Sequence, residues 1–130
     1  MAGATALITG SYGGLGTCFV NIHAGQGGNL ILVGRSKNKL EAQKLEIEEK
    51  YHVNVQTIAA DLSSAEEVEK VYSTCVEQGW KVDYLINNAG FGGQGDFARE
   101  RSMEQDMSML KVNIECPTIL CKLFLPEFIK

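Results

Sequence analysis

The sequence has few of the features that mark extracellular or membrane proteins. Its 130 residues include two prolines, four cysteines and one tryptophan. None of the cysteines (Cys18, Cys75, Cys116 and Cys121) forms a CxxC pair, which argues against a disulfide framework or a metal site and favours buried, reduced thiols. No stretch approaches the roughly 18 apolar residues of a membrane span, and residues 1–4 carry no basic segment of a secretion signal. We therefore expect a cytoplasmic protein without a membrane span.

The chain also lacks an excess of positive charge. Twelve lysines and arginines stand against sixteen acidic residues, which gives a net charge of −4 at pH 7. This balance provides no general attraction to nucleic acid, so any anion must be bound by a local site. Hydrophobic residues make up 45% of the chain, which is enough for the core of one domain over residues 1–130.

Glycine, in contrast, is concentrated near the N-terminus. Residues 9–16 read TGSYGGLG, between an apolar strand at residues 6–8 and a helix that we expect to begin near Gly14. A turn from strand to helix directs backbone N–H groups and the positive end of the helix dipole at one place, which suits a phosphate. Glycines let the backbone approach the ligand, although such a motif alone can also be a simple tight turn.

Strand and helix patterns alternate along the rest of the chain. Further apolar strands are predicted at residues 29–33, 53–60 and 82–86. The last helix is predicted from Met103 to about Phe128. With right-handed crossovers, this alternation gives a Rossmann-type, doubly wound α/β fold whose parallel sheet has the order 3-2-1-4 and stops before a fifth strand.

Local signals specify the helices further. Ser36 is the expected N-cap of the second helix, and two later helices are expected to begin with capping boxes, formed by Ser64 with Glu67 and by Ser102 with Gln105. In the first helix, Leu15, Phe19 and Ile22 recur at helical spacing and give the helix an apolar face.

The predicted topology brings two motifs to one site. The carboxyl ends of the first and fourth strands flank the crevice where the winding reverses, and ligands bind there in such sheets. The glycine-rich turn follows the first strand, and Asn87-Asn88-Ala89-Gly90 follows the fourth. We therefore expect both segments to lie on the rim of one binding site.

The end of the second strand indicates which nucleotide is bound. Proteins of this fold that bind NAD place a carboxylate about 20 residues after the glycines, where it accepts hydrogen bonds from a ribose. Here Arg35 follows the strand, with Ser36, Lys37 and Lys39 behind it and no acid before Glu41. A guanidinium favours a 2′-phosphate, so we expect NADP(H) rather than NAD. The alternative is an ordinary solvated helix start, although cations there oppose the helix dipole.

Four motifs resemble those of the classical short-chain dehydrogenases/reductases over essentially the whole chain. The family's TGxxxGxG is matched by Thr9, Gly10, Gly14 and Gly16, its acid after the third strand by Asp61, its NNAG by residues 87–90, and its catalytic asparagine by Asn113. The glycines also fit TGxxGxxG of the extended branch through Gly13, but the other motifs favour the classical branch. The resemblance implies hydride transfer between NADPH and a carbonyl or alcohol, with ketone, 3-oxoacyl or steroid-like substrates.

The resemblance also implies roles for single residues. Asp61 would bind the adenine amino group, with Leu62 against the ring. Asn87 and Asn88 would tie the fourth strand to its neighbours and close the wall behind the nicotinamide ribose. Local alternatives remain open, since Asp61 could cap the next helix and the asparagines could form a turn.

Backbone and hydroxyl groups of Ser11, Tyr12 and Leu15 would line the pyrophosphate, although Tyr12 could equally be a surface aromatic. The complete expected cofactor-binding set is Gly10, Ser11, Tyr12, Gly14, Leu15, Gly16, Arg35, Ser36, Asp61, Leu62, Asn87, Asn88, Ala89, Gly90 and Val112. Asn113 is the expected catalytic residue. No metal site is expected.

Pro117 lies four residues after Asn113. Proline has no N–H to donate to the carbonyl four residues back, so the Asn113 carbonyl loses its helical partner. In the family this carbonyl holds a water that continues a proton relay. We hypothesise that Pro117 helps to create that water site; the alternative is a proline that simply marks a kink or a helix end.

The family's catalytic tyrosine, the lysine four residues after it and its serine have no counterpart here. None of Tyr51, Tyr72 and Tyr84 is followed by lysine at the fourth position, and His23 and His52 are expected to be solvated or hydrogen-bonded rather than catalytic. We therefore expect the NADP(H)-binding portion of a short-chain oxidoreductase, inactive as it stands.

Two other functions remain open, a non-catalytic module that senses NADP(H) and a methyltransferase-like nucleotide domain, which Arg35 disfavours. We also expect self-association to a homo-oligomer, because the fourth strand would be an apolar sheet edge and the last helix would expose apolar side chains.

Overall fold

The computed structural model describes residues 2–93 and 95–129. Its helices and strands follow in this order: β1 (Thr5–Thr9), α1 (Gly14–Gly25), β2 (Asn29–Gly34), α2 (Lys37–Tyr51), β3 (Val55–Ala59), α3 (Ala65–Gln78), β4 (Tyr84–Ile86), α4 (Met103–Leu110), the π-helical turn η1 (Lys111–Glu115) and α5 (Cys116–Phe128). The alternation of strand and helix is the predicted one.

The four strands form one parallel sheet in the order β3-β2-β1-β4, which confirms the predicted Rossmann-type fold. β1 lies inside the sheet, where Ile8 is opposite Leu32 of β2 and Ile86 of β4. β3 and β4 are each shorter than predicted, since β3 begins at Val55 and β4 at Tyr84. The winding reverses between β1 and β4.

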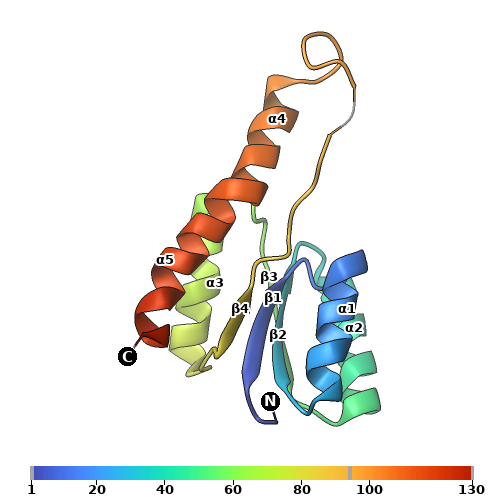
Figure 1. Cartoon of the computed structure of the whole chain (residues 1–130), viewed down its shortest axis with the longest axis vertical. Helices are drawn as coiled ribbons and strands as arrows, with labels where there is room; N and C mark the ends of the chain where they lie inside the picture. Colours follow the sequence, from blue (N-terminus) through green and yellow to red (C-terminus); the bar gives the residue numbers. More distant parts are fainter. Residues whose placement is uncertain (1, 94, 130) are drawn as a thin grey trace.

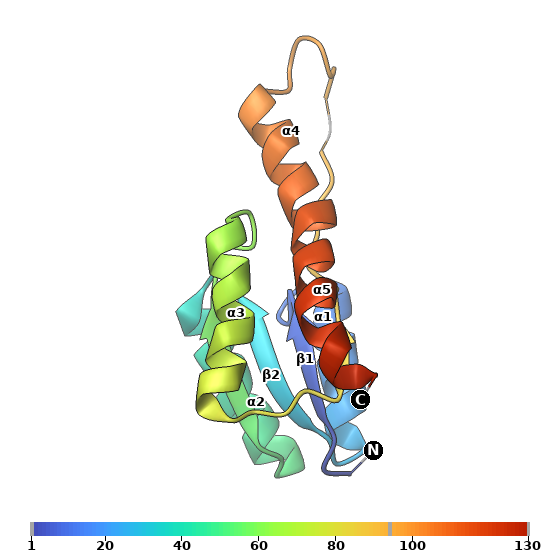
Figure 2. The same cartoon turned by 90° about the vertical axis from the view of Figure 1, so that its left-hand side faces the viewer.

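Successive side chains of β1 and β2 enter two separate cores, because neighbouring residues of a strand point to opposite faces of the sheet. Leu7 and Ile31 pack with α3 and α5. Ile8 and Leu32 pack with α1 and α2. Figures 1 and 2 show these two helix pairs on opposite faces of the sheet. Both faces are thus covered, which explains why the successive middle residues of both strands, residues 6–8 and 30–33, are all apolar.

The apolar spacing of Leu15, Phe19 and Ile22 does not mark the face that α1 buries. Leu15 and Ile22 have 67% and 60% of their surface exposed, and Phe19 is only partly buried. The side chains that α1 buries are instead those of Val20, His23 and Ala24, together with Gly16. The close approach of Gly16 to the Gly10 carbonyl turns this face of the helix toward the sheet. His23 is hydrogen-bonded as expected, with Nε2 3.0 Å from the Ala4 carbonyl oxygen.

The capping predictions are confirmed with one exception. Ser36 caps α2, and Ser102 and Gln105 form a complete capping box at α4. At α3, Ser64 Oγ accepts from the Glu67 N–H at 3.3 Å, but the Glu67 carboxylate accepts from the Asp61 N–H at 3.0 Å instead of from Ser64. Only half of that capping box forms, because the Glu67 carboxylate accepts a hydrogen bond from the Asp61 N–H and not from the Ser64 N–H.

The cysteines differ in burial. Cys75 and Cys116 are buried, and burial raises the pKa of each thiol to about 11. Cys121 is half-buried, and Cys18 is exposed, so the expectation of a buried thiol was wrong for Cys18. Cys18 lies on the side of α1 that faces away from the sheet.

α4, η1 and α5 form one continuous rod, in which α5 packs beside α3 and α4 extends past the sheet (Figure 1). The predicted helix has the expected ends but not a regular middle. Within η1, the Lys111 carbonyl accepts from the N–H of Cys116, five residues on. Pro117 stands in the first turn of α5, and its missing N–H accounts for an irregular helix at this point. No helix in the described part of the chain is long and apolar enough to cross a membrane.

Candidate functional site

A cavity of about 460 Å³ opens at the carboxyl ends of the strands, beside the point where the winding reverses. Five segments form its wall: the glycine-rich turn, the β2–α2 turn, the loop after β3, the segment after β4, and one side of the α4–η1 rod. Eleven of the fifteen predicted cofactor-binding residues line it: Gly10, Tyr12, Gly14, Leu15, Arg35, Asp61, Leu62, Asn88, Ala89, Gly90 and Val112. The predicted residues are thus largely brought together, although Ser11, Gly16, Ser36 and Asn87 do not line the cavity.

The glycine-rich turn needs glycine at two positions for reasons of space and conformation. Gly10 has a φ of +65°, and a Cβ there would lie 3.0 Å from the Ala89 Cα. A Cβ at Gly16 would collide with the Gly10 carbonyl oxygen. Gly14, in contrast, has nothing within 4 Å of the position of a Cβ and faces the cavity. Gly10 and Gly16 therefore shape the turn, whereas Gly14 leaves space in the cavity.

Ser11 is fully buried, and its side chain faces away from the cavity. Its hydroxyl donates to Gln43 Oε1 at 2.8 Å, and Gln43 Nε2 donates back to the Ser11 carbonyl at 2.8 Å. This pair ties the turn to α2. The hydroxyl proton of Ser11 is therefore donated to Gln43 and not to a pyrophosphate, in contrast to the role predicted for this hydroxyl.

The segment after β4 is joined to the end of β1 by three hydrogen bonds. Thr9 Oγ1 accepts from the N–H groups of Asn88 at 3.1 Å and Ala89 at 3.0 Å. Asn88 Nδ2 donates to the Gly10 carbonyl at 3.1 Å. These contacts hold the two motifs side by side on the rim.

Asn87 points the other way, toward α5. Its Nδ2 lies 3.5 Å from Cys121 Sγ. Its Oδ1 is buried and has no hydrogen-bond partner in the described part of the chain. Asn87 thus contacts α5 rather than the cavity, and an unpaired buried carbonyl of this kind is costly.

Asp61 lies at the start of the loop after β3. Its Oδ1 accepts from the Ser63 N–H at 3.0 Å and from the Ser63 hydroxyl at 2.7 Å. These hydrogen bonds, with a smaller contribution from the positive charge of Arg35, lower the pKa of the Asp61 carboxyl. The group is therefore an ionised acceptor at neutral pH, and Arg35 is close enough to influence it.

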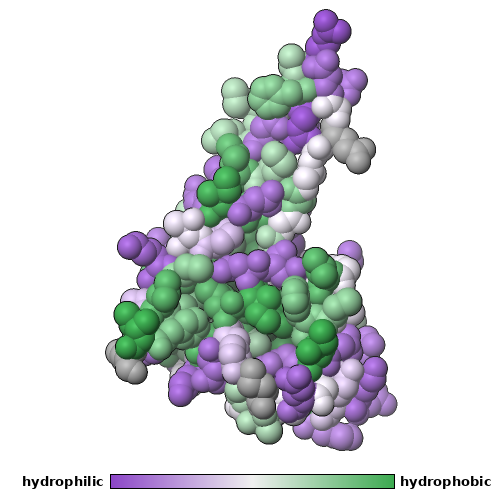
Figure 3. Space-filling view, in the orientation of Figure 1, coloured by the Kyte–Doolittle hydropathy of each residue, from purple (hydrophilic) through white to green (hydrophobic). Residues whose placement is uncertain are grey.

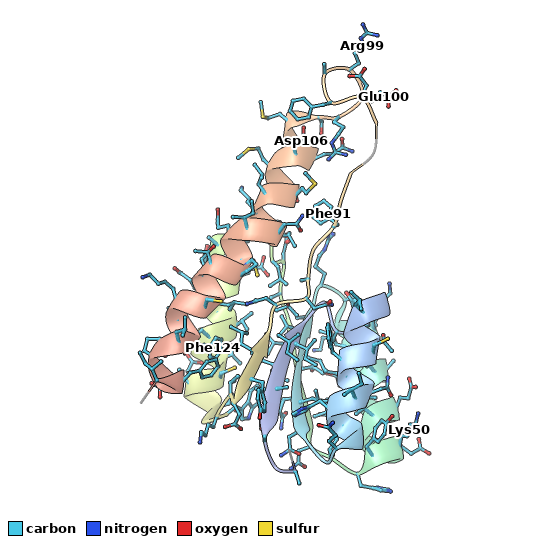
Figure 4. The ribbon with its side chains drawn as sticks, viewed as in Figure 1. Lys50, Phe91, Arg99, Glu100, Asp106 and Phe124 are labelled. Atoms are coloured by element: carbon cyan, nitrogen blue, oxygen red, sulfur yellow. The ribbon has the colours of Figure 1, made fainter. Side chains whose placement is uncertain are left out.

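Asn113 lies in η1 and is exposed, outside the cavity wall. The Phe91 N–H donates to its Oδ1 at 2.9 Å, and its Nδ2 donates to the Phe91 carbonyl at 2.7 Å. Figure 4 shows Phe91 on the irregular segment that leads from β4 and runs beside the rod of α4, η1 and α5. The Asn113 side chain is thus used to fasten this segment, which leaves its backbone carbonyl as the group for the predicted role.

Six cavity-lining residues were not predicted: Gly13, Gly34, Ala60, Ser63, Phe91 and Ser108. The first five are direct sequence neighbours of predicted residues or lie between them, so a wider reading of each motif would have included them. Ser108 belongs to no motif. It precedes Val112 by four residues, which is the spacing of one helix face.

A parallel sheet of this order, with a glycine-rich turn at its switch point, defines the Rossmann-type class of α/β proteins. Within that class the chain belongs to the short chain dehydrogenase family, whose model matches residues 4–130.

Individual relatives agree with this assignment. The chain is 33% identical over 132 residues to hydroxysteroid dehydrogenase-like protein 1 from Gallus gallus, a match that covers 98% of this chain and 39% of the relative. It is 35% identical over 88 residues to the very-long-chain 3-oxoacyl-CoA reductase from Homo sapiens, with 68% of this chain and 28% of that protein covered.

Solved structures show the same fold. The crystal structure of L-sorbose reductase from Gluconobacter frateurii, complexed with NADPH and L-sorbose, matches with a TM-score of 0.91 and 26% identity, over 98% of this chain and 48% of that one. A short-chain dehydrogenase from Sphingobium yanoikuyae in complex with NADPH matches with a TM-score of 0.89 and 28% identity, over 97% and 48% of the two chains. The chain thus spans about half the length of each of these solved structures and 39% of the Gallus gallus relative.

Proposed function

We propose that this chain is the NADP(H)-binding portion of a short-chain oxidoreductase that transfers hydride between NADPH and a carbonyl or alcohol. The observation that carries the proposal is the convergence of the glycine-rich turn, Arg35, Asp61 and the NNAG segment on one cavity. Related structures support the proposal, since the sorbose reductase and the Sphingobium dehydrogenase were both solved in complex with NADPH.

Each part of the proposed site has a chemical task. The backbone at Gly10 and Gly14 and the N-terminus of α1 would hold the pyrophosphate. The ionised Asp61 would accept a hydrogen bond from the adenine amino group, and the Asn88–Gly90 backbone would close the wall beside the nicotinamide ribose. Bound NADPH supplies the hydride, and the protein supplies the orientation.

Arg35 is the proposed reader of the 2′-phosphate. It is exposed on the cavity wall, and α2 behind it has no acidic residue in its first turn. A charged hydrogen bond to a phosphate is worth roughly 1.5–3 kcal/mol, so NADPH should bind at least about tenfold more tightly than NADH. NAD(H) is accordingly the less favoured cofactor.

Asn113 is the proposed link to proton transfer in the whole protein. The irregular helix at η1 and the missing N–H of Pro117 support an Asn113 carbonyl that accepts from a water molecule. The chain has no tyrosine followed by lysine at the fourth position. We therefore expect the 130 residues to bind the cofactor without turning over substrate, and the 3-oxoacyl or steroid-like substrate class belongs to the whole protein.

Self-association is also part of the proposal. β4 pairs only with β1 among the described strands, so its other edge can pair. Met103 and Ile114 of the rod have 78% and 60% of their surface exposed, and Figure 3 shows hydrophobic side chains gathered along the rod and beside β4. Sedimentation should therefore reveal dimers or larger species, whereas a single monomeric species would contradict this part.

Titration with NADPH and NADH tests the proposed cofactor. We expect Arg35→Ala to reduce the preference for NADPH toward the value for NADH. Arg99→Ala is the matched control, because Arg99 is an exposed arginine at the tip of the loop before α4, far from the cavity (Figure 4). Equal affinity of the unsubstituted chain for both nucleotides would contradict the proposal.

A further inference from the structure

Tyr12 belongs to the glycine-rich turn, but its side chain reaches the neighbouring turn between β2 and α2. The Ser36 N–H donates to the Tyr12 hydroxyl oxygen at 3.0 Å. The ring lies against Gly34, where a Cβ would be only 3.2 Å from Tyr12 Cζ and 3.3 Å from its hydroxyl oxygen. A side chain at position 34 would therefore push the ring away, because interiors have no spare volume.

Lys39 makes a third contact with this tyrosine. Its Nζ lies 5.4 Å from the centroid of the Tyr12 ring, within the range of a cation–π interaction. The Lys39 N–H donates to Ser36 Oγ at 3.3 Å, which is the cap of α2. Tyr12 thus contacts Gly34 and Ser36, the two neighbours of Arg35 in the chain. It also contacts Lys39, a cation four residues after Arg35.

These contacts bear on the entropy of phosphate binding. The Arg35 side chain is exposed, and a guanidinium on a mobile turn would lose backbone and side-chain freedom when it binds an anion. A turn whose residues 34 and 36 are already fixed by Tyr12 loses less. The Ser36 N–H is also one of the unpaired donors at the start of α2, and Tyr12 supplies its acceptor.

We propose that Tyr12 is a positioning residue for the 2′-phosphate, which holds the β2–α2 turn and Lys39 so that Arg35 meets the phosphate in a fixed place. This inference rests on the proposed NADP(H) preference and extends it. Tyr12 acts on the choice between the nucleotides through the Ser36 N–H. A contact between Tyr12 and the pyrophosphate would instead strengthen the binding of NADP(H) and of NAD(H) equally.

The chain contains a matched tyrosine for comparison. Tyr51 is half-buried like Tyr12, its hydroxyl donates to Asn21 Oδ1 at 2.9 Å, and Lys50 Nζ lies 5.1 Å from its ring centroid. Lys50, beside it in sequence, lies at the end of α2 that is remote from the cavity (Figure 4). Tyr51→Phe therefore removes a hydroxyl of the same kind without touching the β2–α2 turn.

The test compares adenosine 2′,5′-bisphosphate (2′,5′-ADP) with 5′-AMP, which differ only in the 2′-phosphate, by calorimetric titration of the whole chain. We expect Tyr12→Phe to lower the affinity for 2′,5′-ADP about fivefold, the factor that one ordinary hydrogen bond is worth. The affinity of Tyr12→Phe for 5′-AMP should not change, and Tyr51→Phe should change neither affinity. Gly34→Ala, which displaces the ring, should also lower the affinity for 2′,5′-ADP selectively.

Each result has a distinct meaning. A selective loss for 2′,5′-ADP in Tyr12→Phe supports the inference. An unchanged ratio of the two affinities, or an equal loss for both ligands, overturns it while the NADP(H) proposal stands. If the unsubstituted chain itself does not favour 2′,5′-ADP, the proposed cofactor preference fails and the role of Tyr12 fails with it.

Discussion

The sheet region and the α4 region of this molecule are held together in different ways. Leu7, Ile8 and Leu32 of the sheet have no exposed surface, whereas α4 has no buried residue. Asn88 reaches across to Thr9 over 79 positions of sequence, while Arg101 at the start of α4 pairs with Asp106 only five residues on. Figure 4 shows Asp106 near the free end of the rod.

This difference separates the two halves of the proposed site. The glycine-rich turn, Arg35 and Asp61 follow strands of the buried sheet, so their backbones are fixed before a ligand arrives. Phe91, Ser108 and Val112 close the other side. Phe91 is exposed and Ser108 lies on α4, which has no buried residue, so only Val112 of the three packs against the core. We therefore expect the adenosine side to be pre-organised and the nicotinamide side to be easier to disturb.

The largest expected difference between the regions is in stability. Leu32→Ala removes a fully buried side chain from the sheet and should lower the free energy of unfolding by about 2–5 kcal/mol. Leu110→Ala removes the same group from α4, where 46% of it is exposed, and should cost less than about 1 kcal/mol. Urea unfolding measures both. Similar losses would contradict the contrast between the regions.

Two glycines of the same turn should respond differently to alanine. Gly16→Ala places a methyl group against the Gly10 carbonyl and should cost about 1–3 kcal/mol of stability. Gly14→Ala meets no atom and should stay within about 0.5 kcal/mol of the unsubstituted chain, but its methyl group enters the cavity and should weaken NADPH binding. Equal thermal stability of the two variants would show that the turn is not closed by Gly16.

The smallest expected effect concerns pH. The pKa of Asp61 is lowered in the folded chain by its hydrogen bonds to Ser63, with help from Arg35. Its contribution to stability is therefore complete above the pKa of the unfolded chain, about 4, and is lost as the pH falls through the lower folded value. Asp61→Asn should be less stable than the unsubstituted chain at pH 7, and this gap should narrow in acid. A gap that stays constant down to pH 2–3 would contradict the role of the Asp61 charge.

The order of the strands and most of the cavity could be predicted because both depend on patterns along the chain. The apolar runs of β1 and β2 reflect burial on both faces, and the motif residues follow strand ends that meet at one edge. Arg35 and Asn88 were placed by these rules and Asp61 by the family resemblance, and all three lie on the cavity wall.

The errors concern contacts between distant residues, which periodicity does not contain. Ser11 was expected to face a ligand, but Gln43, 32 residues away, takes its hydroxyl. Ile22 belongs to the apolar spacing expected for α1, but Gly16 packs against Gly10, the helix buries Val20 and Ala24 instead, and Ile22 is exposed. Pro117 indicated an irregular helix, but the π-helical form of η1 depends on the Cys116 N–H reaching Lys111.

The central claim is that separate segments form one NADPH site at the carboxyl edge of the sheet. Amide NMR spectra of the chain, recorded during titration with NADPH, test it most directly. We predict that the resonances that change belong to residues 10–15, 34–37, 61–63 and 88–91, with smaller changes in α4. Changes confined to the outer face of α4 and α5, or no change at saturating NADPH, would contradict the account.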